Sequence, residues 1–337
     1  MPAYTRDQTI GPKNAIERVA IVGAGGTIGS HITSALLKTG RHTITALTRK
    51  NSTNKLPPGV LIAPIDYNKP STLTTALQNQ DILIITLSPT TPKDTHAKLV
   101  QAAAHAGIRY IIPNAYGADI ENVKLGEETL LGPVGAAQRA QINDLGMHWI
   151  AVCTGFWYEY SLAGGAGRFG FDFSKRAVTF YDDGTTRTSS STLGQVGRAV
   201  AGVLSLPVRP TPGADDGLTL ADFVNKPLYV KSFVLSQRDM FESVKRVTGT
   251  GDADWSISYE DSEKRYVDGL ALVKKGDMGG FSKLLYARVF SPDDCTDFSG
   301  KAQNEMLGLP EEDLDEATRA GIELVEELKG RAERMAN

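Results

Sequence analysis

The sequence contains few of the residues that build disulfide frameworks or metal centres. Only two of its 337 residues are cysteine, Cys153 and Cys295, and its five histidines form no HExxH or similar pair. A disulfide scaffold or a metal site is therefore not expected. Cys153 lies inside an apolar run and is predicted to be a small buried side chain. So few cysteines fit a reducing compartment such as the cytosol.

Long apolar runs and an excess of basic residues are also missing. No run reaches the ~20 apolar residues that span a bilayer, and the polar start MPAYTRDQTIGPKN has no signal-peptide core. There are 36 Lys and Arg against 39 Asp and Glu, so the formal net charge of −3 gives no basic footprint for a nucleic acid. We expect a soluble, cytoplasmic protein with a small-molecule partner and no nucleic-acid or membrane partner. Its oligomeric state stays open.

The first half of the chain alternates short apolar runs with helical patterns. Runs such as RVAIV (18–22) and DILIITL (81–87) are typical of strands buried on both faces of a parallel sheet. This alternation predicts an α/β fold, a Rossmann-type doubly wound parallel sheet. The expected strands are 18–22, 43–47, 59–65, 81–87, 109–112 and 149–153. The expected helices are 28–38, 95–106 and 136–145, with another beginning at Ser71.

The strongest motif is GAGGTIGS, which directly follows the first predicted strand and opens the first predicted helix. Gly23 permits a tight turn, Gly26 lets the backbone approach a diphosphate, and Gly29 lets helix and strand pack closely. The helix N-terminus at Thr27 and Ile28 offers N–H groups and a positive dipole end to the phosphates. The motif predicts dinucleotide binding. A glycine turn in a fold that binds nothing is the alternative.

The end of the second strand bears on which dinucleotide is bound. An NAD site usually has an acid there, about 20 residues past the glycines, for the ribose 2′-hydroxyl. Here the strand is followed by Thr48, Arg49 and Lys50, with no carboxylate. Arg49 can bind the 2′-phosphate of NADPH through two hydrogen bonds, and Lys50 can add charge. NADPH is therefore the predicted cofactor. A solvated basic pair is the alternative.

Four further residues are predicted to lie along the same nucleotide. Asp66, just past the third strand, can meet the adenine amino group, and Tyr67 can lie near the ring. Ser88 ends the fourth strand, where the diphosphate and nicotinamide ribose pass, and Asn114 follows the fifth strand. For Asp66, a turn or helix-cap residue is an equally good interpretation.

The pattern of the chain changes after Gly155. A glycine-rich stretch is followed by predicted strands over 177–181 and 228–235, helices ending at Leu206 and Val247, and helices near 261–274, 279–288 and 311–334. We therefore predict an NADP-binding Rossmann domain over 1–155, with sheet contributions from later residues. A smaller mixed α/β substrate-binding region over 156–337 is expected to cover the carboxyl ends of the strands.

Several segments carry a resemblance to a known family. They are GAGGTIG at 23–29, LTRK at 47–50, RYIIPNAYGAD at 109–119, LGMHWIAVCTGFWYEYSL at 145–162 and VTFYDDGTTRTSSST at 178–192. With them the chain resembles the atypical short-chain dehydrogenases of the NmrA-like and isoflavone reductase-like family, especially fungal members, to about Val247. The resemblance implies a Rossmann domain, a small C-terminal substrate domain and NADPH. It also implies reduction of C=C, C=O or benzylic ether bonds of aromatic or alkaloid-like metabolites, although other members are redox-sensing regulators without turnover.

The catalytic pattern of that family is incomplete here. No tyrosine has a lysine four residues later, so the YxxxK pair of ordinary short-chain dehydrogenases is absent. The resemblance places Gly135 where isoflavone reductase-like members have a lysine, and Arg139 at the family's arginine. The family's PSEFG loop is PNAYG here, so Ala115 replaces its glutamate.

Tyr116 and Lys124 remain as candidates for acid chemistry. Tyr116 follows the fifth strand, where the nicotinamide is expected, and can donate a proton or hydrogen-bond a carbonyl. A phenol with an ordinary pKa of about 10 is a poor acid unless a neighbouring charge tunes it. Lys124 can supply that charge or donate the proton itself. The alternatives are packing on the cofactor for Tyr116 and a solvated surface position for Lys124.

Four aromatic residues come directly after the sixth strand: Phe156, Trp157, Tyr158 and Tyr160. At the carboxyl end of a strand they can form the wall of a flat, apolar substrate pocket, with polar Tyr and Trp atoms for orientation. Packing between the two parts of the chain is the alternative for some of them.

Three functions stay open. The favoured one is an NADPH-dependent reductase of a small, partly aromatic secondary metabolite, with hydride transfer to C=O, C=N or conjugated C=C. The second is cyclisation or condensation of an iminium-type substrate in the same pocket. The third is a dinucleotide-sensing regulator without catalysis.

Overall fold

The large sheet of the protein has seven parallel strands in the order β11-β6-β5-β4-β1-β2-β3. We describe a computed structural model for residues 14–88, 90–210, 217–293 and 296–336. Neighbouring strands run in the same direction, with Val22 beside both Leu47 of β2 and Ile85 of β4. The predicted Rossmann-type fold is therefore confirmed. The strands are β1 (Arg18–Val22), β2 (Thr43–Arg49), β3 (Leu61–Ile65), β4 (Ile82–Ile85), β5 (Tyr110–Ile112), β6 (His148–Cys153) and β11 (Lys226–Tyr229).

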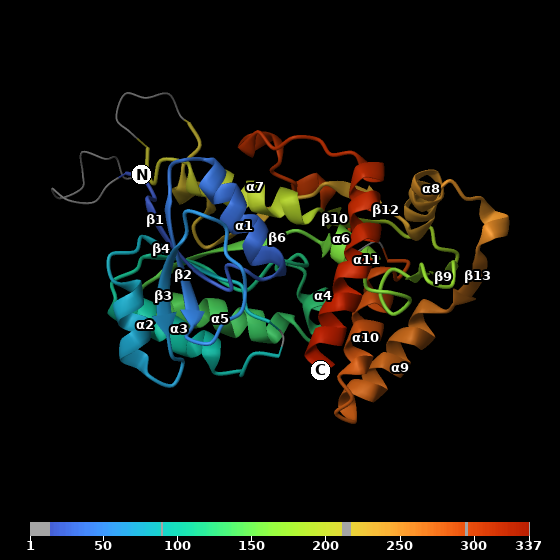
Figure 1. Cartoon of the computed structure of the whole chain (residues 1–337), viewed down its shortest axis with the longest axis horizontal. Helices are drawn as coiled ribbons and strands as arrows, with labels where there is room; N and C mark the ends of the chain where they lie inside the picture. Colours follow the sequence, from blue (N-terminus) through green and yellow to red (C-terminus); the bar gives the residue numbers. More distant parts are fainter. Residues whose placement is uncertain (1–13, 89, 211–216, 294–295, 337) are drawn as a thin grey trace.

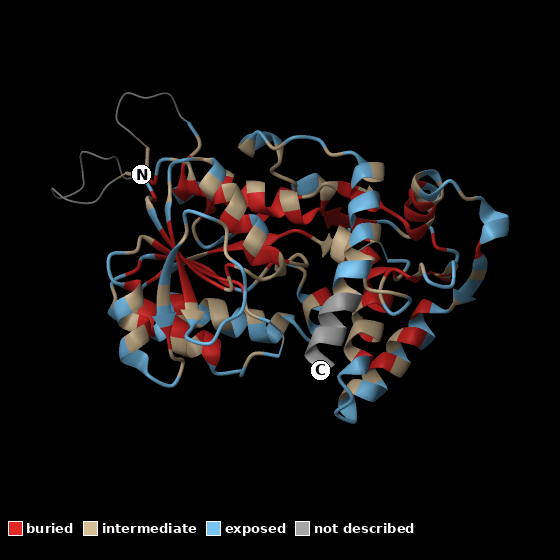
Figure 2. Ribbon diagram, in the orientation of Figure 1, coloured by how far each residue is buried: buried red, intermediate tan, exposed pale blue. Residues whose placement is uncertain are grey.

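Helices cover both faces of this sheet, as Figure 1 shows. On one face lie α1 (Thr27–Lys38) and α7 (Leu193–Leu204), and on the other α2 (Pro70–Leu77), α3 (Thr95–His105) and α5 (Gly132–Asp144). The inner strands β1, β4 and β5 are almost wholly buried (Figure 2), which explains why their sequences are apolar on both faces. Burial of apolar surface on both sides makes this layer the main core.

The helices α1 and α7 run parallel and in close contact. A Cβ at Gly197 of α7 would lie 2.6 Å from the carbonyl oxygen of His31 in α1. At the carboxyl ends, the Arg41 guanidinium donates to the Ser205 carbonyl oxygen at 3.0 Å. The amino ends of α1 and α7 therefore lie next to each other. With β11, α7 places residues from beyond 156 within the sheet layers, while the two-domain boundary itself stays a prediction.

The second region contains two three-stranded sheets and a group of helices. The sheets have the orders β12-β10-β7 and β13-β9-β8. Their strands are β7 (Phe156–Trp157), β8 (Phe171–Asp172), β9 (Ala177–Tyr181), β10 (Thr188–Ser191), β12 (Phe233–Leu235) and β13 (Ser256–Glu260). The helices are α6 (Tyr158–Leu162), α8 (Gln237–Thr248), α9 (Ser262–Lys274), α10 (Gly279–Val289) and α11 (Leu314–Ala336), and α4 (Val123–Glu128) precedes α5. A separate, aromatic-rich core joins these elements.

One strand predicted from the sequence is two strands in the structure. The run 228–235 is divided into β11, which pairs with β6, and β12, which pairs with β10. The change of sheet is fixed where the Val230 N–H donates to the Cys153 carbonyl oxygen and the Ser232 N–H to that of Ser190. Among the residues that the structure describes, no helix is long and apolar enough to cross a membrane.

Candidate functional site

The glycine turn between β1 and α1 is packed so closely that two positions admit no side chain. Gly23 has a φ of +80°, and a Cβ there would lie 2.0 Å from the Thr86 carbonyl oxygen. A Cβ at Gly29 would lie 2.1 Å from the Gly23 carbonyl oxygen and 2.7 Å from the Thr86 hydroxyl oxygen. That hydroxyl donates to the Val22 carbonyl oxygen at 2.8 Å. The start of α1 is thus held directly against the ends of β1 and β4.

The amino end of α1 is left open to an anion. Its N-cap residue is Gly26, no side chain caps it, and its first turn holds no acidic residue. A Cβ at Gly26 would meet only the Gly23 carbonyl oxygen, at 3.1 Å. The helix end keeps its positive dipole uncompensated, with Thr27 and Ile28 in the first turn. This cradle fits a dinucleotide diphosphate.

Two exposed cations follow the neighbouring strand. Arg49 ends β2, and Lys50 comes next. Neither forms an ion pair with any residue that the structure describes. Arg49 acts on the half-buried Tyr67, whose pKa is raised by burial and lowered to a smaller extent by the arginine charge. The end of β2 therefore holds a guanidinium without an ion pair among the described residues, whose charge acts on Tyr67.

Asp66 forms a local turn in the structure. Its Oδ1 accepts from the Asn68 N–H at 2.9 Å, and its Oδ2 lies 4.0 Å from the Lys69 ammonium nitrogen. Its backbone N–H donates to the Thr72 hydroxyl at 3.0 Å. The turn interpretation accounts for these contacts, and the carboxylate remains half-buried at the edge of the candidate adenine site.

Asn114 fixes the loop that follows β4. Its side-chain oxygen accepts from the Leu87 N–H and its amide nitrogen donates to the Leu87 carbonyl oxygen, both at 3.1 Å. Both polar ends of the amide are therefore engaged by one backbone residue. Ser88, which follows Leu87, caps its own turn through Thr90, and the hydroxyl oxygens of Ser88 and Thr90 lie 2.9 Å apart. Asn114 is a positioning residue for this loop.

Tyr116 is buried at the carboxyl end of the sheet without a polar partner. Only 8% of its surface is exposed, and its hydroxyl forms no hydrogen bond with the described residues. Burial raises the pKa of this phenol well above its ordinary value. The indole nitrogen of Trp157, which packs against the same cluster, is also buried without a partner. Two unused hydrogen-bond donors thus belong to the core between the sheet and the helices α1 and α7.

Lys124 does not act on Tyr116 in this structure. Burial is the sole cause of the Tyr116 pKa shift, with no contribution from a charge. The Lys124 side chain is 70% exposed, and its ammonium group lies 3.7 Å from the carboxylate of Asp293. The hypothesis that this lysine tunes the phenol is therefore wrong, because Lys124 lies on α4 and pairs across to the C-terminal region.

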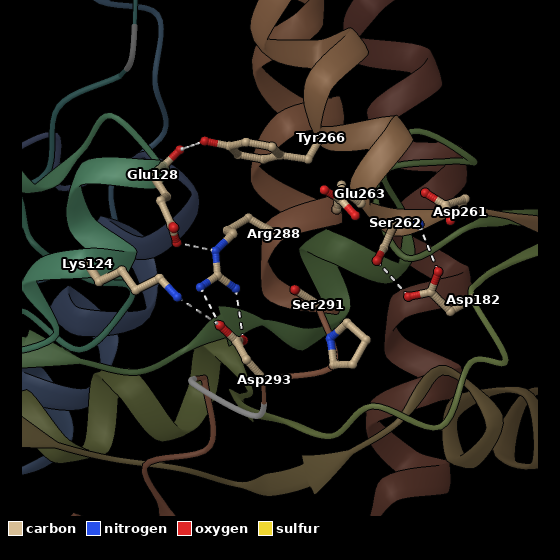
Figure 3. Close-up of a pocket in the computed structure, with 12 residues that line it drawn as sticks. Lys124, Glu128, Asp182, Asp261, Ser262, Glu263, Tyr266, Arg288, Ser291 and Asp293 are labelled. Atoms are coloured by element: carbon tan, nitrogen blue, oxygen red, sulfur yellow. Dashed lines mark hydrogen bonds and ion pairs between the residues drawn. The ribbon is translucent and has the colours of Figure 1, made fainter.

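Lys124 instead borders a cavity of about 400 Å³ between α4 and the helices α9 and α10 (Figure 3). At its centre, the buried Arg288 is bound to Glu128 of α4 and donates to Asp293 at 3.0 and 2.8 Å. The Tyr266 hydroxyl donates to the Glu128 carbonyl oxygen at 3.1 Å. These bonds join the first half of the chain to its C-terminal helices.

The four aromatic residues after β6 are divided between two environments. Tyr158 is fully buried, and its hydroxyl oxygen lies 2.7 Å from that of Thr318. Its prediction as a substrate-binding residue is wrong, because the first turn of α6 points it into the aromatic core. Phe156, Trp157 and Tyr160 are half-buried. Trp157 meets Tyr160 edge to face, with ring centroids 5.8 Å apart.

Phe156 and Tyr160 are each held by one further neighbour. Phe156 stacks on Tyr286, with centroids 4.1 Å apart and planes 3° from parallel. The Arg168 guanidinium lies 4.0 Å from the centroid of the Tyr160 ring and donates to its backbone carbonyl oxygen at 2.6 Å. The three half-buried rings are therefore fixed in place before any ligand binds.

An arginine occupies the space beside the position of the family's lysine. A Cβ at Gly135 would lie 3.2 Å from a guanidinium nitrogen of Arg139. This guanidinium lies 5.4 Å from the centroid of the Trp149 ring, and burial lowers its pKa. The structure thus has a cation near Gly135 on α5, but it is supplied by Arg139, four residues later in the sequence.

A buried carboxyl pair at the start of α7 is absent from the predicted sites. The Glu159 carboxylate accepts from the Leu193 N–H at 3.1 Å, while Glu312 accepts from the Thr192 hydroxyl at 2.8 Å and pairs with Arg198. Burial, reinforced by the charge of Glu312, raises the pKa of Glu159 to about 7. One feature of the sequence could have indicated this carboxyl, because Glu159 is an acid inside the aromatic run FWYEY.

The fold also brings a tyrosine and a lysine together at the end of β11. The Lys301 ammonium nitrogen lies 3.4 Å from the Tyr229 hydroxyl oxygen, 72 residues away in sequence. Burial and hydrogen bonds to Asp119 and Glu121 raise the pKa of Tyr229. A catalytic Tyr–Lys pair needs the opposite effect. Cys153 nearby is 1% exposed, and burial raises its pKa to about 12. Within the described ranges, no group of three metal-binding side chains occurs.

Comparison with known proteins agrees with this geometry. Residues 23–161 match the family model described as NAD(P)H-binding. An Aspergillus flavus protein named oxidoreductase aprR is 30% identical over 312 residues, which are 89% of this chain and 96% of that protein. The Penicillium oxalicum oxidoreductase poxI is 24% identical over 314 residues, 89% of this chain and 92% of that protein.

Solved structures share the fold at low sequence identity. A crystal structure of isoflavone reductase has a TM-score of 0.67 and 19% identity, covering 91% of this chain and 99% of that one. Leucoanthocyanidin reductase from Vitis vinifera, solved as a binary complex with NADPH, has a TM-score of 0.68 and 17% identity. That comparison covers 90% of this chain and 99% of the reductase.

Proposed function

This chain belongs to the NmrA-like and isoflavone reductase-like family of NAD(P)H-dependent oxidoreductases, and we propose that it uses NADPH to reduce a small, partly aromatic metabolite. The observation that carries this proposal is the open, acid-free amino end of α1, with the unpaired Arg49 at the end of the neighbouring strand. An anion seat and a separate guanidinium match a diphosphate and a 2′-phosphate on one ligand. The relatives named above as oxidoreductases support the same assignment.

The glycine turn and the ends of β2 and β3 would hold the nucleotide. The first turn of α1 would hold the diphosphate, because the absence of side chains at Gly23, Gly26 and Gly29 leaves the backbone accessible to it. Arg49 grips the 2′-phosphate and Lys50 adds charge. Tyr67 and Asp66 would contact the adenine. Ser88 would lie near the diphosphate, in the loop that Asn114 holds in place.

The substrate would lie against the half-buried rings of Phe156, Trp157 and Tyr160. NADPH supplies the hydride when bound, and these rings orient a flat acceptor and exclude water from it. The unused donors of Tyr116 and Trp157 hydrogen-bond an oxygen of the ligand, which removes the cost of leaving them buried and unpaired. Tyr116 therefore orients the ligand, because its raised pKa makes it a weak acid.

Among carbonyl, imine and conjugated alkene acceptors, a cationic C=N group fits these side chains best. Hydride addition to an iminium carbon gives a neutral amine without a proton donor, whereas reduction of a ketone needs one. The candidate acids are unsuited to donation, since Tyr116 is a weak acid and the Lys124 ammonium is exposed and paired with Asp293. The same observation favours a second function, cyclisation or condensation of an iminium substrate without net redox change.

Binding and turnover of NADPH test the proposal in sequence. Calorimetric titration with NADPH, NADP⁺ and NADH gives the cofactor preference. NADPH oxidation at 340 nm is then followed with a panel of iminium ions, aldehydes and enones. Iminium turnover supports the reductase. Conversion of the panel without NADPH oxidation supports the second function, and tight binding without any conversion identifies a dinucleotide-sensing regulator.

Replacement of Arg49 tests the position of the 2′-phosphate. Arg49→Ala is expected to weaken NADPH binding about 10- to 100-fold, as for loss of charge-assisted hydrogen bonds, and to leave NADH binding nearly unchanged. Lys38→Ala removes an exposed cation from the far end of α1 and is the matched control. An equal loss for NADPH and NADH in the Arg49 variant would contradict the assignment.

A further inference from the structure

A second cavity lies in the groove between α3 and α5. Its volume is about 500 Å³, within the range of small-molecule sites. Its walls include Ala97, Val134 and Ala137, and its polar groups include Lys93 and His96. None of these residues takes part in the proposed dinucleotide or substrate contacts, so the cavity calls for a separate explanation.

His96 is a buried polar group of this cavity that lacks a partner. Only 4% of its surface is exposed, and neither ring nitrogen has a hydrogen bond with the described residues. Burial lowers its pKa to about 4, and the Gln141 side-chain amide, which lies near the imidazole but outside hydrogen-bonding geometry, acts more weakly in the opposite direction. The imidazole is therefore neutral at pH 7 and offers one N–H donor and one acceptor. Polar atoms buried in this way usually have a partner, which a ligand can supply.

The charge around the cavity favours an anionic ligand. Lys93 is exposed and forms no ion pair with the described residues, and the lining contains no carboxylate. Helix α5 begins here without a side-chain cap and without an acid in its first turn, so its positive end is uncompensated, whereas the N-cap residue of α3 is itself an acid, Asp94. The nearest acid, Asp94, is paired with Lys98 at 2.8 Å.

We propose that this cavity binds a small aromatic carboxylate. The carboxylate accepts from the imidazole N–H of His96 and faces the Lys93 ammonium group, while the ring covers Ala97, Val134 and Ala137. Val134 is 59% exposed, a large value for an apolar side chain, and a bound ring removes that surface from water. None of the residues that line the cavity is placed at the dinucleotide, so the occupant does not enter the dinucleotide cleft.

Calorimetric titration of the full chain with 2-naphthoate tests this site. We expect a Kd below about 1 mM. Because one charge-assisted contact is worth about a factor of ten, His96→Leu should weaken binding about 10-fold or more and Lys93→Gln several-fold. His105→Leu changes an exposed residue at the far end of the same helix and should bind as the wild type does. The neutral analogue 2-naphthalenemethanol should bind at least several-fold more weakly.

Other measurements keep the proposal open to refutation. His96→Leu removes an unpaired imidazole and should keep its melting temperature. If it does not fold, Val134→Glu places a repelling charge on an exposed wall and should abolish binding. Unchanged affinity in the folded variants, or no 2-naphthoate binding at all, would overturn the proposal. Competition between NADPH and 2-naphthoate would place the probe in the dinucleotide cleft, and a dimer that buries Val134 would assign the groove to a second copy.

The two proposals fail separately. NADPH affinity of the His96 and Lys93 variants should equal that of the wild type, since neither residue is placed at the dinucleotide. Loss of NADPH binding in the Arg49 variant would in turn leave 2-naphthoate binding intact.

Discussion

Replacing Glu159 by glutamine should make the protein more stable at neutral and alkaline pH. The Glu159 carboxyl is buried at the start of α7, close to a second carboxylate, Glu312. Burial raises its pKa from 4.5 to about 7, the charge of Glu312 acts in the same direction, and Arg198 acts in the opposite one. Glutamine keeps an oxygen that can accept from the Leu193 N–H but cannot ionise. The substitution therefore removes the unfavourable charge and preserves the contact.

The magnitude and the pH window follow from the pKa. At 1.36 kcal/mol per pH unit, the raised pKa corresponds to roughly 3 kcal/mol. Because the folded-state pKa lies above the unfolded one, the unfolded chain loses this proton first as the pH rises. Below about pH 4.5, Glu159 therefore does not lower the stability of the wild type. Between about pH 4.5 and pH 7, the wild type loses stability progressively. We expect Glu159→Gln to match the wild type near pH 4 and to exceed it by up to about 3 kcal/mol near pH 8.

Urea unfolding followed by circular dichroism from pH 4 to pH 9 measures this difference. The slopes with urea must agree between the two proteins, so that the midpoints compare stability alone. Glu312→Gln is the matched control, because Glu312 pairs with Arg198 and accepts from Thr192 and Ser232, and its loss should destabilise the protein. If Glu159→Gln were less stable than the wild type at pH 8, or if its advantage did not vary with pH, the reasoning would be wrong.

Two further substitutions test the dinucleotide cradle and the cleft. Gly29→Ala should lose at least about 2 kcal/mol of stability, because its methyl group would clash with the Gly23 carbonyl oxygen. Gly26→Ala should fold normally and bind NADPH more weakly. Thermal unfolding measures the first effect and calorimetric titration the second, and equal stability of the two variants would contradict the geometry. Tyr116→Phe removes a buried, unpaired hydroxyl and should leave the ligand-free protein as stable or up to about 1 kcal/mol more stable. The same variant should reduce turnover about 10-fold, and unchanged kinetics would assign Tyr116 to packing alone.

The first half of the fold was predictable because its signals are local. Strands such as β1 and β4 are buried on both faces and must be apolar throughout, so they stand out in the sequence. The glycine turn was equally clear, since Gly23 and Gly29 each face a backbone atom where no Cβ fits. Alternation of such strands with helices then leaves a doubly wound parallel sheet as the natural solution.

The rest depended on contacts between distant residues. The division of 228–235 between two sheets is fixed by carbonyl oxygens of Cys153 and Ser190, and neither contact leaves a local pattern. Lys124 is paired with Asp293, far along the chain, which the sequence near Tyr116 does not indicate. Tyr158 was misassigned because the start of α6 lies within the aromatic run, and the helical spacing of Tyr158, Ser161 and Leu162 turns this side inward.

The parallel helices α1 and α7 explain why glycine spacing alone is a poor guide to an anion site. Both begin with a glycine-containing segment, and neither Gly197 of α7 nor Gly29 of α1 has room for a Cβ, but Gly197 faces the neighbouring helix. At α7, Thr192 caps the helix, Glu159 accepts from the Leu193 N–H and Glu312 supplies negative charge, so the helix end is already compensated. At α1 nothing does so, and the adjoining strand β2 ends in a cation, Arg49, without an ion pair among the described residues. The site is therefore identified by what the first turn lacks, a cap and an acid, as much as by its glycines.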